Sequence, residues 1–308
     1  MTTPRAAVDV GSNSVRLLIV DPSGARVRRE MAITRLAAGV DATGHLDDAA
    51  LDRTLRTIAR FHDLWVSHGV DGRVRIAATS AVRDASDRQR FFDGVLAVTG
   101  VPAEVISGEQ EALLAYAGAT GGVEVPRPTA VIDIGGGSTE LIIGDPSDEV
   151  VGAVSLQLGC VRVTERHLLS DPASAVQLAA ARDLIEAQLD RAVEVLGSSE
   201  VPLSDVSALV AVAGTATTLG ALHLGLDRYD EDRIHGARIS AAALGALADR
   251  LVAMTSAERA QLGPIQPGRE DVIHGGAMVL HAALARTGLD EVVISEADSL
   301  DGLAASLA

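Results

Sequence analysis

The chain has 308 residues, of which 47% are hydrophobic and only 2% aromatic, so it can bury one large core or two ordinary cores built mainly from Ala, Val, Leu and Ile. Its formal net charge of −16 argues against nonspecific binding to nucleic acid or to an anionic membrane, because the long-range field repels both. All 26 basic residues are arginine, which excludes a Walker-type phosphate loop and a Schiff-base lysine.

Other composition features predict a soluble protein of the cytoplasm. No stretch approaches the roughly 18–20 apolar residues that cross a membrane, and no basic segment followed by an apolar run marks a signal peptide. The single cysteine, Cys160, excludes an internal disulfide and fits a reducing compartment.

The first part of the chain alternates short apolar runs with amphipathic segments. Ala6–Val10 and Val15–Val20 predict two strands joined by a tight turn, and apolar residues at helical spacing predict a helix over Leu46–Gly69. The further predicted elements are a strand at Val74–Thr79, a helix at Arg83–Thr99, a strand at Ala103–Ile106 and a helix from Gly108 to about Tyr116.

A segment rich in Gly and Pro, Gly121–Pro128, predicts a domain boundary. We therefore expect a first lobe over 1–125 and a second over 126–298, with the closing helix 299–308 as a candidate to pack back on the first lobe. The elements predicted beyond the boundary are strands at Ala130–Ile134, Glu140–Ile143, Ala208–Ala213 and Glu291–Ser295, and helices at Asp171–Gly197, after Gly214, at Ser240–Met254, at Asp271–Thr287 and at Ser299–Ala308.

An internal repeat is the strongest organisational feature. When the chain is shifted by 124 residues, identical residue types fall in register along the same strand–turn–strand pattern. The identical pairs are Asp9/Asp133, Gly11/Gly135, Ser14/Ser138, Leu17/Leu141, Ile19/Ile143 and Asp21/Asp145. The repeat predicts an α/β protein with two similar lobes facing a cleft.

Each repeat places small residues and hydroxyls in its turn, which is typical of phosphate binding. Glycine lets backbone N–H groups approach an anion closely, and consecutive N–H groups form an anion-binding nest. The candidate phosphate-binding residues are Ser12, Asn13 and Ser14 in the first turn, and Gly135, Gly136, Gly137, Ser138 and Thr139 in the second. Two ordinary β-hairpins with polar turns are the alternative.

Acidic residues flank both turns. Asp9 and Asp133 stand at the strand ends, and Glu140 follows the second turn, so these three are candidate ligands of Mg²⁺ beside the phosphates. A third candidate phosphate contact is Gly214-Thr215, at a predicted strand-to-helix junction where a helix N-terminus can face an anion. A plain helix cap with close packing explains that junction equally well.

Four segments together resemble one family. They are Asp9-Val-Gly-Ser-Asn-Ser14, Ala78-Thr-Ser-Ala-Val-Arg83, Ile106-Ser-Gly-Glu-Gln-Glu-Ala112 and Ile132-Asp-Ile-Gly-Gly-Gly-Ser-Thr-Glu140. The set is similar to the exopolyphosphatase/guanosine pentaphosphate phosphatase (Ppx/GppA) family, in a short two-domain form, and the closing 295–302 segment resembles a late motif of that family. The resemblance implies two ribonuclease-H-like lobes of the actin/Hsp70/sugar-kinase superfamily, each a mixed sheet with flanking helices.

The resemblance also implies roles for single residues. Glu111 matches the proposed general base, which would orient a water and accept its proton, with Glu109 as the competing candidate. Arg83 matches an arginine that grips a phosphate. Asp133 and Glu140 resemble the acids that organise metal and water, and the second turn resembles the cradle of the phosphate that is cut.

The expected function is release of terminal phosphate from inorganic polyphosphate, with hydrolysis of pppGpp as the second choice. Mg²⁺ or Mn²⁺ is the expected cofactor, and a monovalent cation is a further candidate. The family implies a homodimer, and the net charge argues against a nucleic-acid or membrane partner. We expect the chain to lack the additional C-terminal domain of longer relatives, which leaves a preference for very long chains open. A superfamily kinase and a sensor that binds polyphosphate or alarmone without turnover remain alternatives.

Overall fold

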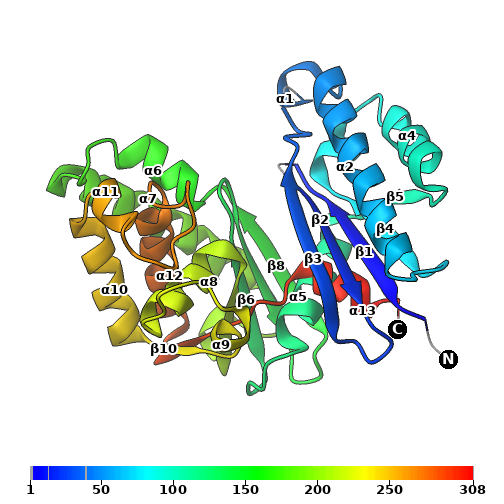
Figure 1. The fold of residues 1–308 in the computed structure, drawn as a ribbon. Coiled ribbons are helices and arrows are strands. Elements are labelled where there is room, and N and C mark those ends of the chain that lie inside the picture. Colours follow the sequence, from blue (N-terminus) through cyan, green and yellow to red (C-terminus); the bar gives the residue numbers. More distant parts are fainter. Residues whose placement is uncertain (1–2, 13, 39, 308) are drawn as a thin grey trace. The chain divides into compact units, whose positions relative to one another are not determined.

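The computed structural model describes residues 3–12, 14–38 and 40–307, and the chain divides into two compact units (Figure 1). Unit 1 contains the stretch up to Gly118 together with the stretch from Ser299, and unit 2 is Ala119–Asp298. The division falls inside a helix, α5 (Gly108–Thr120), and precedes the Gly- and Pro-rich segment at which the sequence analysis placed the boundary.

Unit 1 is built on a five-stranded mixed sheet. The strand order is β3-β2-β1-β4-β5, in which β1, β4 and β5 run parallel and β2 is antiparallel to both of its neighbours. The strands are β1 (Arg5–Val10), β2 (Ser14–Val20), β3 (Arg26–Ile33), β4 (Val74–Ala78) and β5 (Ala103–Val105), and the helices are α1 (Val40–Thr43), α2 (Asp48–Ser67), α3 (Ser80–Asp84), α4 (Gln89–Thr99), α5 and α13 (Ser299–Ala305).

The alternation of side chains along these strands produces two cores, one on each face of the sheet. Val8, Leu17 and Ile76 point to the face covered by α2 and α4, where they are buried with Phe61 and other apolar residues of the helices. The neighbouring positions on each strand point to the opposite face, where α13 contributes its apolar side chains. Unit 1 therefore has three layers, with the last helix of the chain lying against its first strands (Figure 1).

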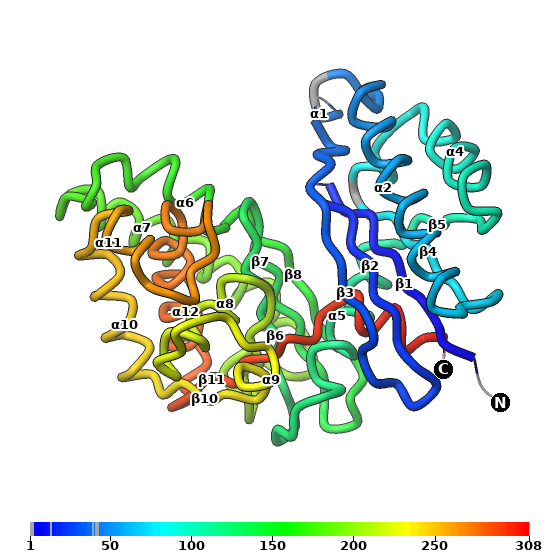
Figure 2. Tube along the Cα trace, in the orientation of Figure 1, coloured from blue at the N-terminus to red at the C-terminus, as the bar shows by residue number. Residues whose placement is uncertain are grey.

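Both ends of the described chain belong to unit 1 (Figure 2). The carboxylate of Asp301 on α13 accepts from Arg26 at 2.9 Å and from Arg29 at 3.1 Å, and Arg73 donates to the carbonyl of Leu307. This closing helix, a candidate from the sequence to pack on the first lobe, contacts β1 and β2.

Unit 2 repeats the same sheet and adds one strand. Its order is β10-β11-β9-β6-β7-β8, in which β6, β9 and β11 run parallel and β7 pairs antiparallel with both β6 and β8. The strands are β6 (Thr129–Ile134), β7 (Thr139–Gly144), β8 (Val150–Leu156), β9 (Ala208–Val212), β10 (Arg238–Ser240) and β11 (Glu291–Ile294). The helices are α6 (Cys160–His167), α7 (Ala175–Leu196), η1 (Leu203–Asp205), α8 (Ala213–His223), α9 (Glu231–Ile234), α10 (Ala241–Ala253), α11 (Ser256–Arg259) and α12 (Ile273–Thr287).

The α/β class, with two mixed sheets and flanking helices, is confirmed. Several local predictions were wrong. The helix predicted over Arg83–Thr99 is two helices, because Ala85 is extended and α4 begins only at Gln89. The helix predicted over Asp171–Gly197 begins only after Ser174, which forms a reciprocal capping pair with Gln177.

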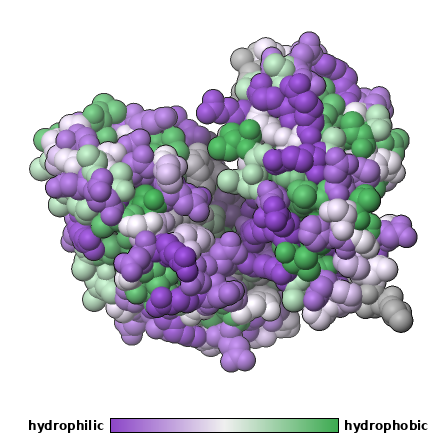
Figure 3. Space-filling view, viewed as in Figure 1, coloured by the Kyte–Doolittle hydropathy of each residue, from purple (hydrophilic) through white to green (hydrophobic). Residues whose placement is uncertain are grey.

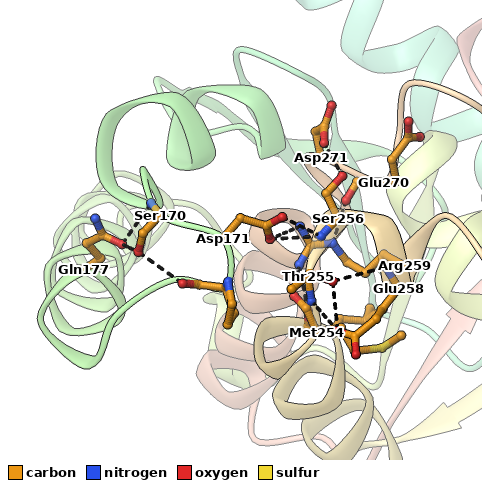
Figure 4. A network of polar contacts seen from close by, with 12 residues as sticks. Ser170, Asp171, Gln177, Met254, Thr255, Ser256, Glu258, Arg259, Glu270 and Asp271 are labelled. Carbon is orange, nitrogen blue, oxygen red and sulfur yellow. Dashed lines mark hydrogen bonds and ion pairs between the residues drawn. The ribbon is translucent and has the colours of Figure 1, made fainter.

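Asp171 has a different role, in a network around the buried Arg259 (Figure 4). The Arg259 guanidinium is 3% exposed and donates to the carbonyls of Glu270, Leu251 and Met254 at 2.6, 3.1 and 2.5 Å. The Asp171 carboxylate lies 3.5 Å away and also accepts from the Ser256 amide at 2.9 Å. These partners satisfy a charge that would otherwise be costly to bury.

His274 lies in the same region, at the start of α12. It is 4% exposed, and burial, followed by the positive charge of Arg259, lowers its pKa to about 4. The imidazole is therefore neutral at pH 7, in keeping with its burial.

The surface is mixed. On the face shown in Figure 3, hydrophobic residues lie in separate groups among hydrophilic ones. None of the helices in the described part of the chain is long and apolar enough to span a bilayer.

Candidate active site

In each unit the candidate residues follow the carboxyl ends of parallel strands. Val10 of β1 is opposite Ala78 of β4, and Ala78 is opposite Val105 of β5, so the segments after these strands meet at one edge of the sheet. That edge is where open α/β sheets bind ligands. In unit 2 the parallel strands β6, β9 and β11 likewise end at one edge of the sheet, where the segments that follow them meet.

The two repeated turns have matching backbone geometry. The amide of Gly11 donates to the carbonyl of Ser14 at 3.0 Å, and the amide of Gly135 donates to that of Ser138 at 3.0 Å. The hairpins also end alike, since Asp21 and Asp145 each accept from amides two and four residues later. Hydrogen bonds from the hydroxyls of Ser23 and Ser147, together with those from the amides, lower the pKa of both aspartates. The structure thus contains the repeat predicted from the sequence; Asn13 lies outside the described residues.

The two hairpins differ in the residue that faces the aspartate. Asp9 is opposite Arg16 across β1 and β2, and the Arg16 guanidinium pairs with its carboxylate while donating to Ser299 Oγ at 2.9 Å. In the second hairpin the matching partner of Asp133 is Glu140. The first aspartate is thus neutralised by a cation, whereas the second faces another carboxylate.

Asp133 and Glu140 form the stronger candidate for a metal site. Residues directly opposite each other on antiparallel strands have Cβ atoms about 5 Å apart, close enough for two carboxylates to share one cation. Glu140 Oε1 also accepts from Ser155 Oγ on β8 at 2.8 Å, which orients it. No cluster of three or more His, Cys, Asp or Glu suited to a metal occurs among the described residues. Mg²⁺ is nevertheless commonly bound by one or two carboxylates together with water and phosphate oxygens, so two protein ligands are enough.

The second turn is held by the N-terminus of α6. The carbonyl of Gly135 accepts from the amide of Cys160 at 3.0 Å, and that of Gly136 accepts from the amides of Val161 and Arg162 at 3.0 and 3.1 Å. The side chain of Arg162 donates to the carbonyl of Gly137 at 2.7 Å. All three carbonyls of the turn therefore point toward α6.

Because the carbonyls of the turn point toward α6, the amides of the turn point away from that helix. In a trans peptide the C=O of one residue and the N–H of the next point in opposite directions. The amides of Gly136, Gly137 and Ser138 must therefore point away from α6, and both Gly136 and Gly137 are exposed. Three consecutive N–H groups on one side form a nest suited to phosphate oxygens. An alanine at Gly159 would disturb this arrangement, because its Cβ would lie 2.4 Å from the carbonyl oxygen of Gly136.

Two predicted phosphate contacts are buried. Thr139 is 0% exposed, and its hydroxyl has no hydrogen-bond partner in the described part of the chain. Thr215 is 4% exposed and contacts Cys160, whose thiol pKa is raised by burial. These hydroxyls lie inside unit 2 rather than at its surface, a placement that sequence spacing did not reveal.

The predicted contact at Gly214 is covered by an arginine that the sequence analysis did not single out. A Cβ at Gly214 would fall 1.6 Å from Nη1 of Arg269, so the guanidinium lies directly against the glycine backbone. An alanine here would displace the guanidinium of Arg269, which occupies the space of the missing Cβ. At the start of α8 the predicted contact through free helix amides is thus replaced by a guanidinium, which can also bind phosphate.

Glu111 and Arg83 lie together in unit 1. Glu111 is in the first turn of α5, which begins with a reciprocal cap between Ser107 and Gln110, and its Oε2 lies 3.9 Å from Nη1 of Arg83. Arg83 also donates to the carbonyl of Ile106 at 3.2 Å. Both side chains remain partly exposed, at 41% and 36%, so each can reach a ligand. Glu109, the competing candidate, is exposed on the same turn.

Comparison with known proteins identifies the family. The model of the Ppx/GppA phosphatase family matches residues 19–308. Exopolyphosphatase 2 of Mycobacterium tuberculosis is 42% identical over 98% of both chains, and exopolyphosphatase 1 of Mycobacterium bovis is 31% identical over 93% of this chain and 83% of its own. The crystal structure of the type II variant of the Aquifex aeolicus Ppx/GppA phosphatase superposes with a TM-score of 0.88 at 27% identity and covers 99% of both chains. The chain therefore belongs to the Ppx/GppA phosphatase family.

Proposed function

We propose that this chain is an exopolyphosphatase, which releases the terminal phosphate of inorganic polyphosphate by attack of water on the last phosphoanhydride bond. The observation that carries the proposal is the pairing of Glu111 with Arg83 at the ligand-binding edge of unit 1. Two relatives that match most of the chain are themselves exopolyphosphatases. Hydrolysis of pppGpp, which has the same terminal anhydride, is the second activity we propose.

The proposed residues have two roles in the reaction: one activates water, and the others neutralise the charge of the phosphate oxygens. Glu111 orients a water molecule and accepts its proton as the O–P bond forms, and the leaving phosphate oxygen departs with the shortened chain. Arg83 binds oxygens of the phosphoryl group that is transferred. The amides of Gly136, Gly137 and Ser138 bind phosphate oxygens and require no reorganisation during the reaction.

A divalent cation fits the acids of the second hairpin. We propose that Asp133 and Glu140 hold Mg²⁺, or Mn²⁺ in its place, which when bound neutralises phosphate oxygens of the substrate. Asp9 is the weaker candidate ligand, because Arg16 already neutralises its carboxylate. We also propose that the protein works in the cytoplasm as a homodimer, in line with its family.

The test compares four substrates in parallel: tripolyphosphate, long-chain polyphosphate, pppGpp and ATP, each with Mg²⁺ and without an acceptor. We expect orthophosphate release from polyphosphate, and a shortened chain as the second product. A strict kinase would release almost none without an acceptor. A sensor would bind polyphosphate in calorimetry and release none, and either result would overturn the proposal.

A further inference from the structure

A basic pocket lies in unit 1, where the end of β3 meets the outer face of α2. Its volume is about 340 Å³, and its lining includes Thr34 and three arginines of α2, Arg53, Arg56 and Arg60. Sites for small molecules usually have volumes of roughly 300–1,000 Å³. None of the residues described as lining the pocket is acidic. The pocket therefore has the size and the charge of an anion site.

The three arginines form a row on one face of the helix. Their spacing of three and four residues places Arg53, Arg56 and Arg60 side by side over about 10 Å of helix length. Arg56 pairs with Asp52 at 2.6 Å, but Arg53 and Arg60 have no carboxylate within ion-pair distance in the described ranges. With 42 acidic and 26 basic residues in the chain, carboxylates are in excess, so arginines without a carboxylate partner are unexpected.

A buried hydroxyl in the lining also lacks a partner. Thr34 is 1% exposed, and its Oγ1 accepts or donates no hydrogen bond within the described part of the chain. The carbonyl of the same residue is already used, since Arg53 donates to it at 3.0 and 3.2 Å. A buried polar group without a partner costs free energy, and rotation of this hydroxyl into the pocket would let it donate to an oxygen of a bound anion.

The pocket lies at the same edge of the sheet as the first phosphate turn. Strand β3 ends beside the start of β2, with Ile33 opposite Ser14, and the amide of Ala37 donates to the carbonyl of Ser12 at 2.9 Å. β1 and β3 are two strand spacings apart, which is about 10 Å. A ligand that extends over a few phosphate groups could therefore contact both the turn and the pocket.

We propose that this pocket binds internal phosphate groups of the polyphosphate chain whose end is being cut, and so favours long chains over short ones. The inference rests on the proposed function. A row of guanidinium groups suits an elongated polyanion better than a single phosphate, and each planar fork can bind two phosphate oxygens.

The kinetic test uses the double variant Arg56→Gln/Arg60→Gln. Arg53 is left intact because it supports the Thr34 carbonyl, and the matched control Arg182→Gln/Arg191→Gln removes two exposed arginines from α7. We expect KM for long-chain polyphosphate to rise about ten- to a hundredfold, from the loss of one or two charge-assisted contacts, with kcat unchanged. KM for tripolyphosphate and both constants of the control should change less than about twofold. Equal KM changes for short and long chains would overturn the proposal.

A binding test separates this proposal from the proposed function. Calorimetry on the Glu111→Gln protein, with and without the two arginine substitutions, measures affinity for long-chain polyphosphate and for inorganic phosphate without turnover. Weaker binding of the long chain alone supports the pocket, even if the wild type releases no phosphate. Unchanged long-chain affinity overturns it, as does loss of inorganic phosphate binding alone, which would mark a site for the free anion.

Discussion

Replacement of Glu111 by glutamine tests the centre of the proposed mechanism, because it removes the charge of the proposed base and keeps its size. A general base contributes about 10²- to 10⁴-fold to rate, so kcat should fall by that factor, which corresponds to about 3–5 kcal/mol of barrier. The structure predicts a much smaller effect on stability. The side chain is 41% exposed, and its oxygen lies 3.9 Å from Arg83.

Those features set an upper bound on the cost to folding. A partly exposed ion pair contributes about 0–1 kcal/mol, and an acidic residue in the first turn of a helix about 0.3–1 kcal/mol. The free energy of unfolding should therefore fall by less than about 2 kcal/mol, whereas the activation free energy of the reaction should rise by about 3–5 kcal/mol. The reciprocal cap between Ser107 and Gln110 is untouched, so α5 should still form.

The assay is steady-state phosphate release from long-chain polyphosphate, with urea unfolding measured on the same samples. Glu109→Gln is the matched control, since it removes one charge from the same helical turn. The role of Glu111 is refuted if its variant loses less than about threefold in kcat while remaining folded. A larger loss from the Glu109 variant would transfer the role to that residue.

Three further predictions follow from the second unit. Glu140→Gln should raise the Mg²⁺ concentration that gives half-maximal activity by at least about tenfold. Ser155→Ala, which removes only the hydrogen bond to that carboxylate, should raise it less. If a Mg²⁺ titration gives the same half-maximal concentration for Glu140→Gln and the wild type, the metal site is contradicted. The pKa of His274 falls from 6.5 in the unfolded chain to about 4 in the fold, so its contribution to stability is complete above pH 6.5 and is lost as the pH falls through 4. The free energy of unfolding should therefore drop by about 2 kcal/mol more between pH 7 and pH 5 in the wild type than in His274→Gln, and parallel slopes would argue against a neutral buried imidazole. Gly159→Ala should cost about 1–3 kcal/mol by forcing a Cβ against the second turn, whereas Gly108→Ala, with open space at its Cβ, should not, as thermal unfolding would show.

The sequence predicted most of the sheet because its strands are apolar runs bounded by turn residues. It did not predict β3, since Arg26–Ile33 carries four charged residues and lies at an edge, where only its hydrogen bonds to β2 define it as a strand. The break before α4 was also missed; there Ala85 is extended and residues 86–88 form a turn.

The sequence contains the residue types of the candidate site but reveals only some of their pairings. The repeat already places Arg16 at the position of Glu140, so the difference between the two hairpins was visible in the alignment of the chain with itself. The contact of Arg269 with Gly214 joins positions that are far apart in sequence, and no local pattern indicates it. The burial of Thr139 depends on how side chains alternate along β7, which a turn motif alone does not specify.

The return of α13 to the first sheet has a consequence for synthesis on the ribosome. Leu300 and Leu303 complete one core of unit 1, yet they are translated after all of unit 2. Domains usually fold in the order in which they are made. Here the second unit can fold while the first still lacks its last helix, so the half of the protein that emerges first should be the last to reach its native state.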